Sequence, residues 1–184
     1  MVKIWRIFMA MGILVGCGGA PEEKTAAVGV VEDLGGITVT VPGGWSSEPP
    51  SNSMRKAQYR LPGDAGDAEL VVTYFGTAGA GGVEANIARW RGQFKDSDGG
   101  SVKTLSVSGM NVTVLDISGS FAGMQRPMGG GGEAKTGQRM LAAVVENAQG
   151  AFYFKLVGPK ATVTQWQSSF DQFVNSIRVS GGKA

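Results

Sequence analysis

Apolar and polar residues alternate along much of the chain, which is the pattern of half-buried β-strands. The first example is Ile37, Val39 and Val41, with threonines between them, and turn residues follow at Pro42 and Gly43. A more continuous apolar run over 68–75 indicates a more central strand. The pattern predicts strands over 37–42, 55–62, 68–75, 101–108, 110–121, 138–147 and 151–158.

Two segments have helical spacing instead. In the first, 83–95, Val83, Ile87, Trp90 and Phe94 follow one another at intervals of four, three and four residues, which places them on one helical face. The second, 160–177, begins after Pro159. Its expected buried stripe comprises Val163, Trp166, Phe170, Phe173, Val174 and Ile177.

The order of these elements predicts the fold class. Short links join neighbouring strands, so we expect an α+β domain in which a largely antiparallel sheet is packed by two helices. The domain is expected over 37–180, and residues 181–184 form a tail. Residues 122–137 contain four consecutive glycines and predict a loop.

The N-terminal segment 1–16 differs from the rest of the chain. Lys3 and Arg6 are followed by an uncharged apolar run over 7–16. As a helix this run would span about 15 Å, half of the ~30 Å hydrocarbon core of a bilayer. That length indicates a secretory signal peptide and not a membrane span.

The run ends at Cys17, the only cysteine of the chain. Leu14, Val15, Gly16 and Cys17 resemble the lipobox of bacterial lipoproteins, in which the signal is removed before the cysteine and the cysteine is acylated. The resemblance implies a lipid anchor at Cys17, followed by a flexible tether up to residue 36. Because Gly18 and not aspartate follows the cysteine, it further implies delivery to the periplasmic side of the outer membrane.

Composition excludes several kinds of chemistry. The chain has no histidine, so a Ser-His-Asp triad is excluded, and a lipidated Cys17 leaves no free thiol. The chain has 17 basic and 15 acidic residues, and loss of Lys3 and Arg6 with the signal balances the two signs. We therefore expect no nucleic-acid partner. No metal or cofactor site is predicted, because Asp96–Gly100 lacks the later ligands of a calcium loop.

Two motifs resemble the PsbP-like α/β/α sandwich. One is the corner Val41-Pro42-Gly43-Gly44-Trp45 after the first strand, and the other is the closing helix from Phe170 to Ile177. The fold is named for an extrinsic photosystem subunit and also occurs in small bacterial lipoproteins. The resemblance covers about 37–179, has no catalytic residues to transfer, and implies a module that binds or scaffolds a partner.

Few residues suggest a reactive site. Asp64, Asp67 and Glu69 could gather carboxylates, and Asp67 and Glu69 would share one face of a strand. A Ser-Lys pair is the other catalytic option, and a polar cleft lined by Asp67, Glu69 or Lys155 would favour an enzyme. The candidate partner-binding residues are Met124, Arg126, Pro127 and Met128, because methionine-rich flexible surfaces adapt to partners.

The sequence thus favours a lipid-anchored lipoprotein of the bacterial envelope that acts as a non-catalytic binding or accessory module. Its expected partners are the membrane and an envelope protein. A small hydrolase that uses carboxylates or a Ser-Lys pair is the first alternative. A carrier of a hydrophobic ligand, held in a cavity between helix and sheet, is the second.

Overall fold

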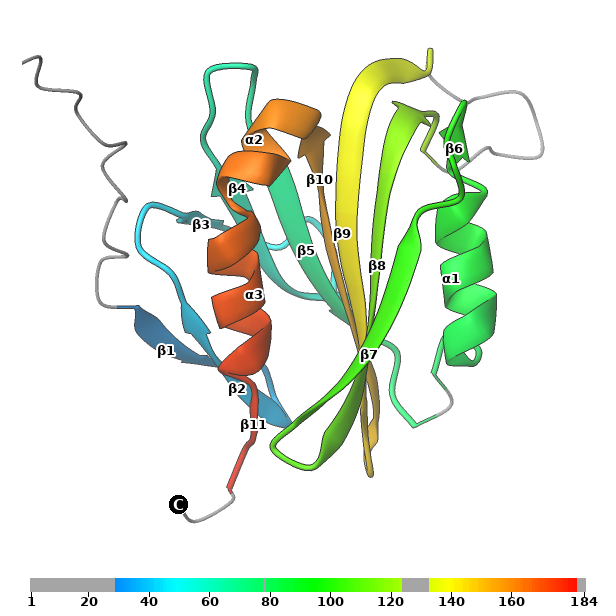
Figure 1. The fold of residues 1–184 in the computed structure, drawn as a ribbon. Helices are drawn as coiled ribbons and strands as arrows, with labels where there is room; N and C mark the ends of the chain where they lie inside the picture. The colour runs from blue at the N-terminus through cyan, green and yellow to red at the C-terminus, as the bar shows by residue number, and fades with distance from the viewer. Residues whose placement is uncertain (1–28, 78, 124–132, 182–184) are drawn as a thin grey trace, which may run out of the picture.

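The computed structural model describes residues 29–77, 79–123 and 133–181, and within these ranges the chain forms two antiparallel sheets and three helices (Figure 1). The expected signal peptide 1–16, Cys17, the first part of the tether and residues Met124, Arg126, Pro127 and Met128 lie outside the described residues. So do residues 182–184 of the expected tail.

The larger sheet has eight strands, all paired antiparallel. Its order is β3-β4-β5-β10-β9-β8, and both β7 and β6 pair with the outer side of β8. The strands are β3 (Ser46–Glu48), β4 (Arg55–Leu61), β5 (Ala68–Tyr74), β6 (Phe94–Lys95), β7 (Ser101–Val107), β8 (Met110–Phe121), β9 (Lys135–Asn147) and β10 (Gly150–Pro159). The predicted antiparallel sheet is confirmed, with β9 beginning inside the expected loop 122–137.

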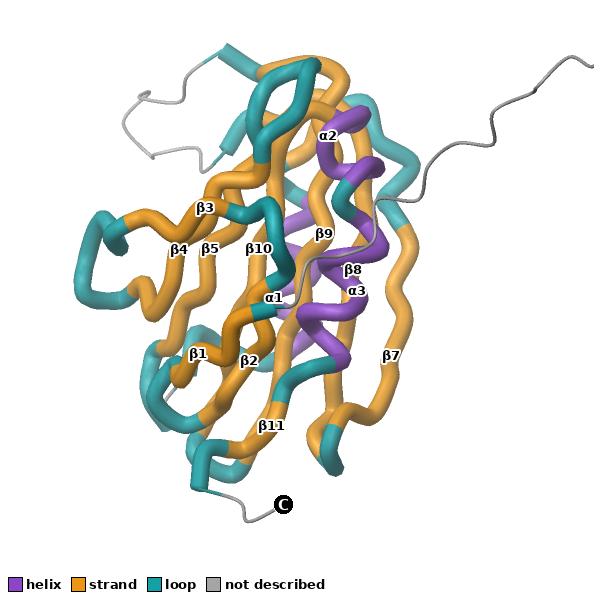
Figure 2. Tube along the Cα trace, turned by 90° about the vertical axis from the view of Figure 1, so that its left-hand side faces the viewer, coloured by secondary structure: helices purple, strands orange, loops and turns teal. Residues whose placement is uncertain are grey.

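The smaller sheet consists of β1 (Val30–Asp33), β2 (Ile37–Val41) and β11 (Arg178–Val179), which lie side by side in Figure 2. The expected tether is wrong at its C-terminal end, because β1 lies within it. Val30 and Val31 point to opposite faces of β1, and both are exposed. The sequence of β1 therefore has no alternation of buried and exposed residues from which the strand could be predicted. Backbone pairing with β2 and the hydrogen bond that the Tyr59 hydroxyl donates to Glu32 at 2.6 Å hold it in place.

The first helix, α1 (Val83–Arg91), covers one face of the larger sheet, which we call the α1 face. Ile87 and Trp90 pack there with Leu115, Ile117 and Met140 of β8 and β9. The expected helical stripe is confirmed, but the helix is shorter than 83–95. It ends at Gly92, and the chain turns so that Phe94 and Lys95 pair with β8 as β6.

The expected helix 160–177 is two helices, α2 (Lys160–Gln165) and α3 (Gln167–Asn175). The break lies at Trp166, whose indole donates a hydrogen bond to the carbonyl of Pro62 at 2.8 Å. This bond ties the break to the turn between β4 and β5. Tertiary contact therefore interrupts a segment whose spacing is helical throughout.

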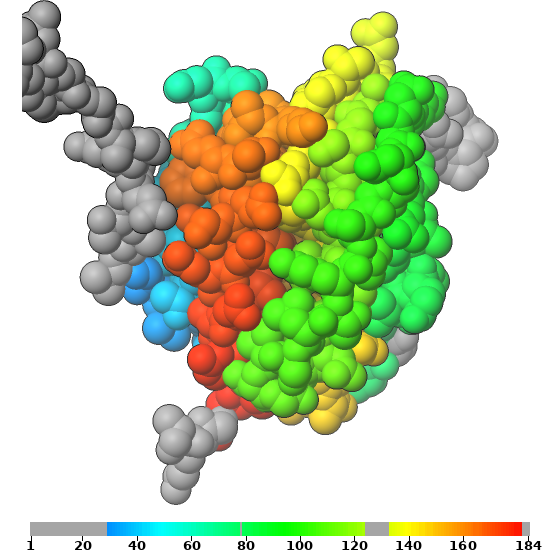
Figure 3. Space-filling view, in the orientation of Figure 1, coloured from blue at the N-terminus to red at the C-terminus, as the bar shows by residue number. Residues whose placement is uncertain are grey.

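Helices α2 and α3 cover the opposite face of the larger sheet, which we call the α3 face. Phe170, Phe173 and Val174 of α3 are fully or nearly fully buried against Phe152, Phe154 and Leu156 of β10. In the space-filling view, α3 lies next to β7, while atoms of β8 and β9 show between α2 and β7 (Figure 3). The helices thus lie on both faces of the larger sheet, as in the predicted α+β class.

The corner after β2 has the packing role expected from its sequence. Gly44 has a φ of +87°, and a Cβ there would lie 2.8 Å from the Trp166 ring. The next residue, Trp45, packs its ring 5.1 Å from Phe173 and 5.8 Å from Tyr59 between ring centroids. The corner thus joins the smaller sheet to α3 and to β4.

A single arginine joins four elements on the α3 face. Arg139 of β9 is 8% exposed and binds both carboxylate oxygens of Asp116 on β8, at 2.9 and 2.7 Å. It also donates to Thr164 of α2 at 2.9 Å and to Gln167 of α3 at 2.8 Å. Because one guanidinium makes all of these bonds, Arg139 holds the junction of α2 and α3 in place against the larger sheet.

Arg139→Met should lower the free energy of unfolding by about 2–4 kcal/mol, because it leaves Asp116 and two helix side chains without their donor. The matched control is Lys103→Met, which removes an exposed ion pair with Asp171 at 3.5 Å and should cost at most ~1 kcal/mol. Urea denaturation of both variants and the wild type measures the difference. Equal stabilities of the two variants would contradict the role given to Arg139.

Candidate functional site

The α1 face is only partly covered, and the uncovered part forms a groove. Helix α1 lies over β8 and β9, while no helix of the described residues lies above the same face of β3, β4 and β5. The space between α1, these strands and β10 has a volume of about 1040 Å³. This is the size of a large small-molecule pocket. Below, "the groove" means this space.

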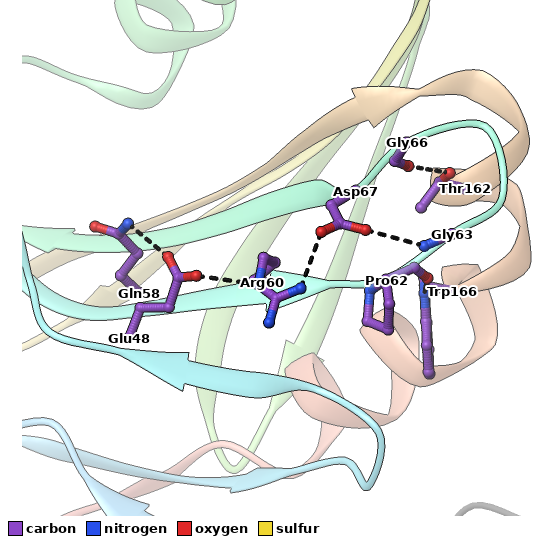
Figure 4. A network of polar contacts seen from close by, with 9 residues as sticks. All are labelled: Glu48, Gln58, Arg60, Pro62, Gly63, Gly66, Asp67, Thr162 and Trp166. Atoms are coloured by element: carbon purple, nitrogen blue, oxygen red, sulfur yellow. Dashed lines mark hydrogen bonds and ion pairs between the residues drawn. The ribbon is translucent and has the colours of Figure 1, made fainter.

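One wall of the groove is a chain of charged side chains, drawn in Figure 4. Arg60 donates to Glu48 at 3.2 Å and to Asp67 at 3.0 Å, and Glu48 in turn accepts from Gln58 at 3.1 Å. The other oxygen of Asp67 accepts from the backbone of Gly63 at 3.3 Å. Arg60 is the largest cause that holds the pKa of Asp67 below its ordinary value.

The turn that carries Asp67 is fixed from behind by α2. The Thr162 hydroxyl donates to the carbonyl of Gly66 at 2.7 Å, and a side chain at Gly63 would overlap that of Thr162. Together with the Trp166–Pro62 bond, these contacts make the turn a fixed support for the charged wall.

A second ion pair lies further along the groove. Arg55 of β4 donates to Glu69 of β5 at 3.0 Å and to Gln58 at 2.7 Å. The side chains of Arg55 and Glu69 are 26% and 51% exposed, so the pair is open to water from the groove. Each carboxylate of the wall is therefore matched by an arginine.

Lys155 differs from these residues. It lies on β10 between Val71 of β5 and Ala142 of β9, and its side chain is half-buried in the groove. None of the ion pairs among the described residues includes it. Burial is the largest cause that lowers the pKa of Lys155; the charge of Glu69 opposes this shift and the charge of Arg55 adds to it.

Aromatic residues line the groove near Lys155. Tyr153 lies two residues before Lys155 on the same face of β10. The centroid of the Tyr153 ring is 5.7 Å from that of Phe75 and 6.5 Å from that of Trp90. Phe121 lies 5.9 Å from Lys155 Nζ, ring centroid to nitrogen, within the range of a cation–π contact. Phe75 is 40% exposed. The groove therefore combines a cation with an apolar wall.

The glycine-rich link before α1 lies at the edge of this wall. The Asn86 side chain donates to the carbonyls of Ala80, Gly81 and Gly82, and the Tyr153 hydroxyl accepts from the amide of Ala80. Arg89 donates to the carbonyl of Ala80 at 3.1 Å. Side chains of α1 and β10 thus hold the link by its backbone, which fits a structural connection and not a phosphate loop.

The structure brings together three of the residues considered from sequence. Asp67, Glu69 and Lys155 all line the groove, and the predicted shared face of Asp67 and Glu69 is confirmed. Asp64 lies outside it. The sequence did not point to Phe75, Trp90 or Arg55 as site residues. Its sequence position is a weak indication that Phe75 is exposed, because an apolar residue directly before a glycine-rich link has no strand partner to cover it.

Within the described ranges, no three acidic or cysteine residues gather closely enough to hold a metal ion. The same ranges contain no helix with the length and apolar character of a membrane span.

Comparison with known proteins gives a structural likeness. No protein-family model matches the chain, and neither does any curated protein. The solution structure of cyanobacterial PsbP (CyanoP) from Synechocystis sp. PCC 6803 is similar, with a TM-score of 0.54 and 12% identity over 89% of this chain and 99% of that one. A Pseudomonas aeruginosa protein of unknown function, PA94, described as a putative regulator, gives a TM-score of 0.45 at 15% identity, over 82% of this chain and 96% of that one. The likeness to CyanoP shows a PsbP-like fold.

Lys155→Met should stabilise the free protein by about 1 kcal/mol, because it removes a half-buried charge that has no carboxylate partner. The folded pKa of Lys155 lies below its ordinary 10.5, so the unfolded chain holds the proton more tightly. The free energy of unfolding of the wild type should therefore rise relative to that of the variant as the pH rises towards 10.5. Denaturation at pH 7 and pH 9.5 measures both effects. A variant that is less stable at pH 7, or a gap that widens with pH, would contradict them.

Proposed function

We propose that the protein is a non-catalytic binding module of the cell envelope, and that the groove is its ligand site. The observation that carries the proposal is Lys155, a half-buried ammonium that forms no ion pair with a carboxylate of the described residues and lies 5.9 Å from the ring centroid of Phe121. A fold does not keep such a charge for stability, because its burial costs free energy. A ligand that binds it returns that free energy.

The fold supports an accessory role. Helices on both faces of the sheet and the Trp45 corner agree with a PsbP-like α/β/α sandwich, which we propose as the architecture of this domain. Fold does not determine function, so the groove and not the likeness carries the proposal.

The carboxylates of the groove are poorly suited to hydrolysis. A general acid needs a raised pKa, whereas Arg60 holds the pKa of Asp67 below its ordinary value. Glu69 is likewise committed to Arg55 at 3.0 Å. The side chains that line the groove among the described residues include no serine for a Ser-Lys pair. The hydrolase alternative therefore lacks its reactive groups.

One observation favours a second candidate. The lowered pKa of Lys155 increases the fraction of neutral amine, which is the form that attacks carbonyl compounds. An enzyme that forms a covalent imine on Lys155 is thus the second candidate. It predicts that a bound carbonyl compound can be trapped on Lys155 by borohydride, whereas the binding module predicts no such adduct.

The anchor belongs to the same proposal. A diacylated Cys17 would hold the protein on the outer membrane without a spanning helix, since two acyl chains give stable attachment. The tether would run from Cys17 to Gly29 and hold the domain roughly 20 Å from the lipid if it is flexible. An envelope protein is the proposed macromolecular partner, with Met124, Arg126, Pro127 and Met128 as its expected contact.

Protein purified from its native membrane should carry a bound small molecule that native mass spectrometry detects. Thr73→Trp, which fills the groove from β5, should remove that mass. The matched control, Thr104→Trp on exposed β7, should keep it. Equal amounts of bound small molecule in the wild type and the Thr73→Trp variant would contradict the groove as the ligand site. Release of the bound molecule in a chemically altered form would contradict a non-catalytic function.

The intact mass of the same material should match a chain that begins at Cys17 and carries acyl groups. Cys17→Ala should remain unprocessed, because the thiol receives the first lipid. An unmodified thiol on a full-length chain would contradict the anchor and the proposed location.

A further inference from the structure

The charges that line the groove do not cancel. Its cationic side chains are Arg55, Arg60, Arg89, Lys135 and Lys155, and its anionic ones are Glu48, Asp67, Glu69 and Glu133. Arg55 and Arg60 are ion-paired, and the carboxylates of the wall are used in those pairs. The surplus is a single positive charge. A ligand that complements the groove therefore carries one negative charge.

The position of Lys155 defines where that charge would lie. Lys155 belongs to a middle strand of the sheet, so its ammonium rises from the floor of the groove and not from its rim. Val71 and Val157 lie beside it on the same face, and Phe121 lies 5.9 Å from Nζ. An anionic group that reaches Nζ must therefore pass between apolar side chains.

The apolar wall indicates what the rest of the ligand is made of. Phe75, Tyr153 and Trp90 form a row of rings with centroids 5.7 and 6.5 Å apart, and Phe75 keeps 40% of its surface exposed. Tyr153 and Trp90 are themselves buried in the core, so Phe75 is the ring of this row that a ligand can cover. Covering it would remove apolar surface from water, which favours an aliphatic or aromatic body. The ligand is thus amphiphilic, with an anionic head and an apolar body.

The backbone around the floor argues against an extended peptide. Strands β5 and β10, which form the floor, each have a paired strand on both sides, so their backbone groups are already bonded within the sheet. A peptide could not add to the sheet here and would have to be recognised by side chains alone. A volume of about 1040 Å³ fits a small molecule instead.

We infer that the groove binds a small monoanionic amphiphile, a carboxylate on an apolar tail or ring, with its carboxylate on Lys155 Nζ and its apolar body against the exposed ring of Phe75. The inference rests on the proposed ligand-binding function and adds the class of the ligand. One ammonium selects one carboxylate, and the exposed ring selects an apolar body.

A set of three probes with the same eight-carbon tail separates head from body. Octanoate, octan-1-ol and octylammonium are each titrated, below their aggregation concentrations, into the full-length chain with Cys17→Ser, and chemical shifts of the backbone amides are followed by NMR. Octanoate should bind about tenfold more tightly than octan-1-ol, because its head makes a charge-assisted hydrogen bond. Octylammonium should bind more weakly than either, because like charges meet at Lys155.

Two variants assign the effect to residues. Lys155→Met should make octanoate and octan-1-ol bind alike, while Lys155→Arg should retain the preference for octanoate. Lys103→Met, outside the groove, should behave as the wild type. Phe75→Ala, at the exposed ring, should weaken both probes by a similar factor and leave the head-group preference intact.

The outcomes distinguish the two levels of the proposal. Equal binding of octanoate and octan-1-ol to the wild type would overturn the carboxylate on Lys155 but leave a groove that binds apolar ligands. Shifts confined to residues outside the groove would overturn the site itself. If none of the three probes binds while native protein still carries a groove-dependent mass, the ligand class is wrong and the binding function stands.

Discussion

The unequal cover on the two faces of β10 is the constraint on which this structure depends. Phe152, Phe154 and Leu156 point to the α3 face, where helices, the Trp45 corner and β7 exclude water from all three. Tyr153, Lys155 and Val157 point to the α1 face, where Trp90 of α1 covers Tyr153 but Lys155 and Val157 are only partly buried. Side chains of one strand therefore complete a closed core on one side and line an open groove on the other.

This asymmetry separates stability from binding. Arg139, with its four hydrogen bonds, and the aromatic cluster around Phe173 lie on the closed face and hold the helices to the sheet. On the open face, each carboxylate of the wall has an arginine, while Lys155 remains a cation without a carboxylate partner among the described residues. The closed face supplies enough burial for the domain to tolerate such a charge.

Much of the fold could be predicted from the sequence, because alternation and helical spacing report burial directly. Strands β2 and β4 and the hairpin of β9 and β10 follow it closely, whereas the three-residue β3 was not predicted. The pattern did not predict the elements whose structure depends on tertiary contacts. Strand β1 is held by backbone pairing and by the hydrogen bond from Tyr59, and the helix break at Trp166 is held by the hydrogen bond to Pro62. The groove was not predictable as a whole, because Lys155, Glu69 and Trp90 meet only once β5, β10 and α1 are placed side by side. Single residues such as Lys155 could be named as candidates, but their partners could not.

The central claim is that the groove holds a small ligand without transforming it. The most direct measurement is a crystal structure of the protein purified from its native membrane, at a resolution that defines bound small molecules. The account predicts density for one molecule in the groove, in contact with Lys155 Nζ and with the ring of Phe75, and with no covalent bond to the protein. An empty groove with a ligand bound elsewhere, or continuous density between Lys155 Nζ and the ligand, would contradict it.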